Sequence, residues 1–253
     1  METARQTSLM ENPEIVELFG VLERNGLSKE HKEVESLVKY LDTMEVQFGE
    51  VLEELRDVKE QLSQIQDRGM KASVLRITEQ AQGKVREVEG QLTRVRKNLI
   101  RSAGNALQTY KEKGRDALQK AVSAMKIPSA LARIEEGLHT TVESMNRQAD
   151  KMKVLNRELQ VAGGHIKNVG RILRGKEQEK IEIQTTDKGI TTKIRKSFLV
   201  LSGRLSSMEQ TTGNVRKRLE QFRAEGRKET ICERGTEKIE RGKENRFPSC
   251  RFP

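Results

Sequence analysis

The feature of this sequence that most constrains its fold is a ladder of apolar residues between positions 34 and 65. The steps between them alternate between three and four without a fault. The ladder consists of Val34, Leu37, Leu41, Met44, Phe48, Val51, Leu55, Val58, Leu62 and Ile65. This is the heptad spacing of an α-helix that buries one narrow face against other helices. It predicts a long helix with an interaction seam, while the number of helices packed around the seam stays open.

The composition of the chain favours more helices of the same kind over a thick globular core. The 253 residues include no Trp, 2 Tyr and 6 Phe, and 34% of them are charged. Such a chain has few large side chains with which to fill a deep interior. We therefore predict an all-α protein, an elongated helical bundle or coiled coil with a disordered basic C-terminal tail.

Breaks in the apolar pattern divide the chain into segments. Pro128 disfavours helix at Ile127, and glycines interrupt the pattern at Gly69 and around Gly163. The last stretch is charged and has no apolar period, which is typical of disorder. The predicted segments are an N-terminal short helix (1–27), an acidic heptad helix (28–68), a basic glycine-containing helical region (69–126), a third helical region (127–175), a charged linker (176–189), a basic amphipathic helix (190–224) and the tail (225–253).

Charge is distributed unevenly along the chain. The net charge is −8 over residues 1–68, +8 over residues 69–126 and +10 over the remainder. Either the acidic part folds against the basic parts, or the basic parts hold an acidic outside partner such as nucleic acid or a membrane surface. Because a basic helix directly follows the acidic ladder, we expect the ladder to face residues 74–99 or the later basic helices of its own chain before any outside partner.

Clusters of basic residues are candidates for contact with nucleic acid. They are Arg94, Arg96, Lys97, Arg101, Lys193, Arg195, Lys196, Arg216, Lys217 and Arg218. Such clusters attract phosphates without sequence preference, but aromatic residues for base stacking are scarce here. The helix over 190–222 is also basic and amphipathic, with Phe198 and Phe222 near its ends, so membrane-surface binding is a further alternative.

Motifs for catalysis, metals and cofactors are incomplete. Gly170 to Lys176 has P-loop spacing, but Glu177 stands where a Ser or Thr should bind Mg²⁺. Glu136 and His139 form a Glu-x-x-His unit, whereas a di-iron bundle needs two such units. Cys232 and Cys250 have no ligand-like spacing. We therefore expect no enzymatic activity, no metal and no cofactor.

The N-terminus lacks the pattern of a secretory signal, and the longest strongly apolar run, residues 198–201, is far too short to cross a bilayer. We therefore expect no transmembrane segment and a cytoplasmic location.

Four stretches together resemble a known but uncharacterised helical coiled-coil family. They are YLDTMEVQFGEVLEELRDVKEQL, NLIRSAGNALQTYKEKGRDALQKAV, KIPSALARIEEGL and HIKNVGRILRGKE. The family is encoded in intestinal Firmicutes, often on conjugative or other mobile elements, and the similarity covers about residues 14–225. It has no assigned activity, so no functional residue carries over. The resemblance implies a bacterial cytoplasmic accessory protein tied to DNA transfer.

These observations predict a non-enzymatic helical interaction or scaffold protein that serves as an accessory factor of a bacterial mobile element. Its partner would be a protein, either another copy of the chain or a different molecule, and a homo-oligomer is open. Electrostatic, sequence-nonspecific nucleic-acid binding is the first alternative. Membrane-surface binding through residues 190–222 is the second.

Overall fold

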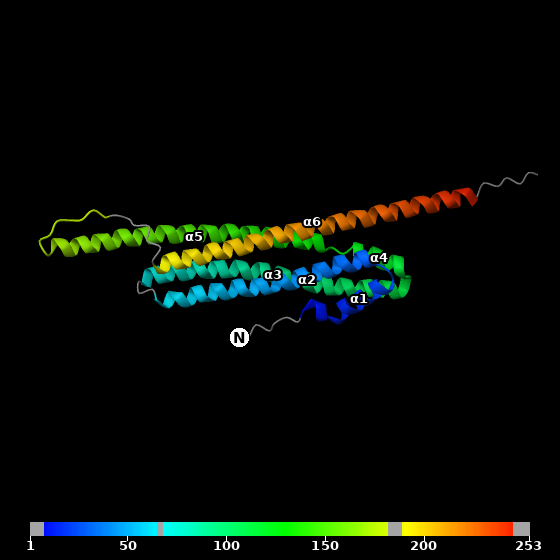
Figure 1. The fold of residues 1–253 in the computed structure, drawn as a ribbon, viewed down its shortest axis with the longest axis horizontal. Coiled ribbons are helices and arrows are strands. Elements are labelled where there is room, and N and C mark those ends of the chain that lie inside the picture. Colours follow the sequence, from blue (N-terminus) through cyan, green and yellow to red (C-terminus); the bar gives the residue numbers. More distant parts are fainter. Residues whose placement is uncertain (1–7, 65–67, 182–188, 245–253) are drawn as a thin grey trace, which may run out of the picture. The chain divides into compact units, whose positions relative to one another are not determined.

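The computed structural model describes residues 8–64, 68–181 and 189–244, and all regular structure within them is helical (Figure 1). The prediction of an all-α helical bundle is therefore confirmed for these residues. The elements are the 3-10 turn η1 (Leu9–Glu11), α1 (Pro13–Arg24), α2 (Ser28–Gln61), the 3-10 turn η2 (Leu62–Gln64), α3 (Arg68–Lys113), α4 (Arg115–Ser123), α5 (Ile127–Ile172) and α6 (Ile190–Glu244).

The chain forms two compact units, each assembled from separated stretches of sequence. Unit 1 consists of Met1–Tyr40, Val95–Ala130 and Asn214–Pro253, and unit 2 of Leu41–Arg94 and Leu131–Gly213. The divisions fall inside α2, α3, α5 and α6, so each of these helices contributes one segment to each unit. The segments predicted from the sequence describe the order of helices, whereas each unit combines helices that are distant in sequence.

The ladder on α2 is buried wherever the structure describes it. Val34 and Leu37 in unit 1, and Leu41 to Leu62 in unit 2, are at most 4% exposed. Ile65 lies outside the described residues. In unit 2 the ladder shares the core with buried side chains of the other three helices, such as Leu92 on α3, Met145 on α5 and Phe198 on α6. The seam is thus filled by the protein's own chain.

Local sequence signals set the main helix boundaries. The Asn12 side chain accepts hydrogen bonds from the N–H groups of Glu14 and Ile15, at 3.1 and 3.4 Å, and Pro13 occupies the first turn of α1. Gly114, with φ of +78°, separates α3 from α4 inside the predicted region 69–126. A positive φ is readily adopted by glycine, which has no Cβ.

α5 fills the predicted third helical region, 127–175, as far as Ile172. It continues through Gly163 and Gly164, because glycine lowers helix stability but, unlike proline, keeps its N–H donor. α6 continues past residue 224 to Glu244. Its extension is rich in Glu, Lys and Arg, which are good helix formers, and contains no Pro. The predicted tail 225–253 therefore overlaps the end of α6, and residues 245–253 lie outside the described residues.

Truncation of the seam should destabilise the protein. Leu55 is fully buried on α2, so Leu55→Ala should lower the free energy of unfolding by about 2–5 kcal/mol. Val46→Ala is the matched control, since Val46 lies on the same helix and is 63% exposed. Denaturant titration followed by circular dichroism measures both, and equal midpoints for the two variants would contradict the buried seam.

Two glycines should respond in opposite ways to alanine. A Cβ at Gly90 on α3 meets open space, so Gly90→Ala should stabilise the helix by about 1 kcal/mol. A Cβ at Gly137 on α5 would lie 2.9 Å from Val88 Cγ2, so the steric contact should cancel or reverse the gain there. Thermal melts of the two variants should therefore shift apart, with Gly90→Ala the higher.

Candidate protein-interaction face

The C-terminal part of α5 carries an apolar stripe in register with the buried seam of the same helix. We call the set Leu155, Leu159, Ala162, Ile166, Val169 and Leu173 the α5 stripe. The stripe continues two rows of residues on α5. Within each row the positions are seven residues apart, and the rows begin at Leu131 and Ile134. All of these residues belong to unit 2 (Figure 1, the yellow-green end of α5).

Exposure rises steeply along one of these rows. Leu131, Leu138, Met145 and Met152 are at most 1% exposed, whereas Leu159, Ile166 and Leu173 are 36%, 73% and 82% exposed. In the neighbouring row Val169 is 56% exposed. The spacing that fills the core of unit 2 thus continues onto an open surface, where the same side chains meet water.

A short return segment, residues 174–181, folds back along α5 on the other side. The Asn168 amide donates to the Glu179 carbonyl at 2.7 Å and accepts from the Glu179 N–H at 3.0 Å. Ile181 packs over Gly164, where its Cγ2 would lie 2.7 Å from an added Cβ. At 100° per residue, Gly164 and Asn168 are on the side of the helix opposite Ile166. The return segment therefore leaves the α5 stripe open.

Charge reinforces the position of this segment. The Glu179 carboxylate lies 3.2 Å from Lys167 Nζ and 3.5 Å from Arg171 Nη1. The hydrogen bond and the positive charge of Lys167, with the charge of Arg171, lower the pKa of Glu179 from its ordinary value of 4.5. The helix ends at Ile172, and the turn after it reaches Gly175, with φ of +69°, where the Lys176 N–H donates to the Arg171 carbonyl. The residues of the P-loop-like motif, Gly170 to Lys176, thus form a helix end.

Acidic residues of α2 form ion pairs with basic residues of the same chain. In unit 2, Arg204 on α6 lies 3.7 Å from Glu50 and 3.5 Å from Glu54. These three line an open groove of about 580 Å³ with Glu53, Asp57, Gln61 and Ser197. In unit 1, Arg218 Nε lies 3.0 Å from Glu33 Oε2. In each unit these pairs place acidic residues of α2 beside a basic residue of α6, as expected if the ladder helix faces a basic helix of its own chain.

The ten basic residues predicted as nucleic-acid contacts are distributed over both units. Arg94, Lys193, Arg195 and Lys196 belong to unit 2, and Arg96, Lys97, Arg101, Arg216, Lys217 and Arg218 to unit 1. Several are engaged internally: Arg96 is buried, Arg216 lies 2.9 Å from Glu220, and Arg218 also donates to Ser36. Arg195 is half-buried, while Arg94, Lys97, Arg101, Lys193, Lys196 and Lys217 are exposed.

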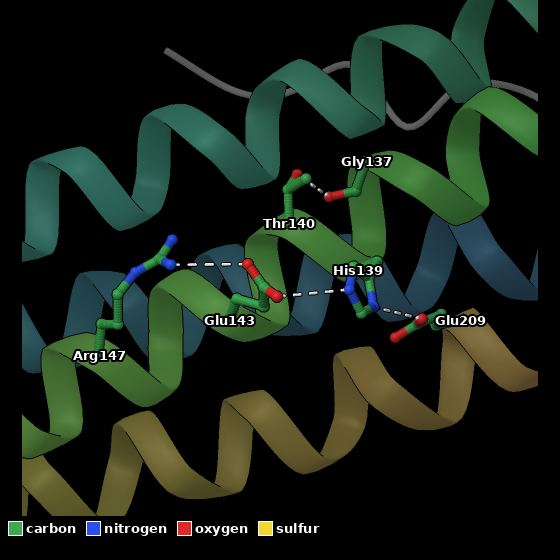
Figure 2. Close-up of polar contacts among 6 residues, drawn as sticks. All are labelled: Gly137, His139, Thr140, Glu143, Arg147 and Glu209. Carbon is green, nitrogen blue, oxygen red and sulfur yellow. Dashed lines mark hydrogen bonds and ion pairs between the residues drawn. The ribbon is translucent and has the colours of Figure 1, made fainter.

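The histidine of the Glu-x-x-His unit, His139 on α5, lies in a surface polar cluster with Glu143, Arg147 and Glu209 (Figure 2). His139 Nδ1 lies 2.9 Å from Glu209 Oε1 on α6, and His139 Nε2 lies 3.4 Å from Glu143 Oε1. Arg147 Nη1 lies 3.5 Å from the other oxygen of Glu143. A protonated imidazole can donate to both carboxylates. Within the described part of the chain no group of three or more His, Cys, Asp or Glu side chains could hold a metal ion.

The apolar face of α6 that suggested membrane binding is occupied by the bundle. Phe198 is fully buried in unit 2, and Phe222 is 9% exposed in unit 1. The side chains expected at a bilayer surface therefore contribute to the cores of the folded units. Among residues 8–64, 68–181 and 189–244, no helix is both long enough and apolar enough to cross a membrane.

Fold and surface together define a helical-bundle protein with one heptad face left open on α5. Residues 11–250 match a family of unknown function, DUF6674, and the chain belongs to that family. No curated protein and no solved structure matches the chain. The predicted membership of an uncharacterised family is confirmed, while its bacterial host and mobile-element setting stay predictions.

The open stripe was the part of the site that sequence reasoning missed. The sequence places residues 155–173 in the third helical region, with an interruption around Gly163, and does not single them out as an open face. The heptad spacing gives no sign that burial ends near Met152, because the same residue types continue beyond it. The only available signal was the charged linker after Gly175, which offers no apolar partner for the stripe.

The ion pairs of Glu179 should be visible as a pH dependence. Its pKa is lowered in the folded protein, so the contact is present above the ordinary value of 4.5 and is lost as the pH falls through the lowered pKa. In Lys167→Gln the pKa of Glu179 should rise towards the ordinary value. Carbon-detected NMR titration of the Glu179 carboxyl measures this, with Lys153→Gln as the control that removes the same charge elsewhere on α5. An equal pKa in both variants would contradict the assignment.

Proposed function

We propose that the protein is a non-enzymatic helical interaction or scaffold protein that acts in the cytoplasm as an accessory factor of a bacterial mobile element. The observation that carries the interaction role is the α5 stripe, where Leu159, Ile166, Val169 and Leu173 are 36–82% exposed. Burial of apolar surface stabilises an association by roughly 25 cal/mol per Å². Contiguous exposed apolar residues in a regular row are typical of a binding surface.

The form of the stripe favours a helix as the bound partner. Its residues alternate at steps of four and three from Leu155 to Leu173, the spacing by which α5 packs in the core of unit 2. Side chains at this spacing fit between side chains of a facing helix. The ladder of α2 is unsuited to this role in the folded protein, because its described residues are already covered.

The non-enzymatic part of the proposal is supported by the chemistry of the candidate motifs. His139 faces Glu209 and Glu143 on the surface, and Glu136 is exposed beside it. The P-loop-like residues end a helix and carry Glu177 where the motif requires a hydroxyl. The mobile-element setting is supported by the family resemblance alone, and genes adjacent to this one test it directly.

A photo-crosslinking amino acid at Val169 tests the interaction role in cells. Val169 belongs to the stripe and is 56% exposed, so irradiation should join the protein to whatever protein covers it. The control is the same amino acid at Val46, which is exposed on α2 away from the stripe. Protein adducts at Val169 and their absence at Val46 support the proposal. Equal yields, or none at Val169, would contradict it.

Sequence-nonspecific nucleic-acid binding is the second candidate function. It is favoured by the exposure of Lys97 and Arg101, which lie one helical turn apart on α3 in unit 1. Each neutralised phosphate contributes about 0.9 to the slope of log affinity against log salt. Binding through both residues should therefore give a steep fall in affinity as salt is raised.

The double variant Lys97→Gln and Arg101→Gln tests this second function. It should weaken binding to nonspecific duplex DNA and reduce the salt slope by about 2. The variant Lys153→Gln and Arg157→Gln removes the same charge from α5 and is the matched control. A fluorescence-anisotropy titration at several salt concentrations measures both, and no binding of the wild type at low salt would exclude the function.

A further inference from the structure

We infer that the α5 stripe is the interface of an antiparallel homodimer, in which it packs against the same stripe of a second copy of this chain. The inference rests on the proposed interaction role, to which it adds a partner and a geometry. The first argument is continuity. The stripe extends the register of Leu138, Met145 and Met152, so a helix laid on it would continue the packing that exists inside unit 2.

The spacing of the stripe is self-complementary when the second copy runs in the opposite direction. The stripe is symmetric about position 164. Leu155 and Leu173 lie nine residues on either side of it, Leu159 and Val169 five, and Ala162 and Ile166 two. Antiparallel pairing therefore forms three layers: Leu155 with Leu173 of the second copy, Leu159 with Val169 of the second copy, and Ala162 with Ile166 of the second copy. A small side chain meets a large branched one in the central layer, as tight packing requires. Repetition by the two-fold axis doubles these contacts.

Flanking positions remove the usual obstacles to self-association. Charged residues beside a heptad seam form salt bridges with the partner helix and so determine which helix binds. Like charges at these positions would repel a second copy of the same chain. The flanks of this stripe are Asn156, Gly163 and Gly170 on one side and Glu158, His165 and Ile172 on the other. In the antiparallel pair Glu158 meets Ile172 of the second copy, so no carboxylate faces another. Gly163 meets Gly163 of the second copy near the axis, where two glycines allow close approach of the helices.

The same flanks disfavour other occupants. An acidic helix of another protein would be selected by Lys or Arg at these positions, and the flanks have neither. A bilayer would be favoured by aromatic residues at its surface, and residues 151–175 contain none. On the opposite side of α5, Lys167 and Arg171 hold Glu179 of the return segment.

Cysteine cross-linking tests both the partner and the direction, in a background with Cys232→Ser and Cys250→Ser. Leu155→Cys and Leu173→Cys proteins are oxidised separately and as a mixture. Antiparallel pairing predicts disulfide-linked dimers in the mixture alone, because equal positions in the two copies lie about 27 Å apart along the helices. Dimers formed by Leu155→Cys on its own indicate parallel pairing and overturn the geometry.

The oligomeric state of the full chain provides the second test. Light scattering coupled to size-exclusion chromatography should show the wild-type mass rising from one chain towards two between about 1 and 300 μM, the range for a small helical interface. Val169→Glu should weaken this association at least about tenfold, since it buries a charge in the interface. Val46→Glu, also at an exposed valine, should leave it unchanged.

The outcomes separate this inference from the proposed function. A wild type that stays monomeric, with no disulfide in the mixture, overturns the homodimer. If Val169 then cross-links to a different protein in cells, the interaction role stands with another partner. If the wild type instead sediments with vesicles containing anionic phospholipid, and Val169→Glu abolishes this, the stripe binds membranes and the homodimer is overturned. Monomeric protein with no adduct at Val169 overturns both proposals.

Discussion

Burial of the α2 ladder is the constraint on which the rest of the structure depends. A charged chain with 3% aromatic residues cannot build a thick core, so its stability depends on narrow seams of Leu, Val and Met. The ladder supplies a long, regularly spaced seam and contributes to both units. Since each seam covers one side of a helix, the fold needs several helices around α2, and α3, α5 and α6 provide them in unit 2.

Ion pairs around α2 contribute little to the free energy of folding, but they favour its packing against basic helices. Arg204 with Glu50 and Glu54, and Arg218 with Glu33, join an acidic helix to a basic one at its exposed edges. Exposed pairs of this kind contribute about 0–1 kcal/mol each. The negative charge of α2 nevertheless disfavours arrangements that would place this helix against another acidic surface. Part of the uneven charge of the sequence is therefore used in pairs between α2 and α6.

The sequence predicts those features of the fold that depend on the local spacing of apolar residues and on local capping or helix-breaking residues. The heptad steps indicate the buried side of α2. Pro128 indicates the break between α4 and α5, although Ile127 is itself the first residue of α5, where proline is tolerated in the first turn. The open face on α5 was beyond such reasoning, because exposure of Ile166 or Leu173 depends on where the neighbouring helices end. The division into two units could not be predicted from the sequence either, because it depends on which distant segments of the chain pack together.

The discontinuous construction of the units imposes an order on folding during synthesis. Unit 2 lacks its last helical segment until Gly213 has been made, and unit 1 is incomplete until the chain beyond Asn214 has followed. The α2 ladder is made early, and α3 follows it directly, whereas the segments of α5 and α6 that complete unit 2 come much later in the chain. Such non-local contacts slow folding and prolong exposure of apolar surface.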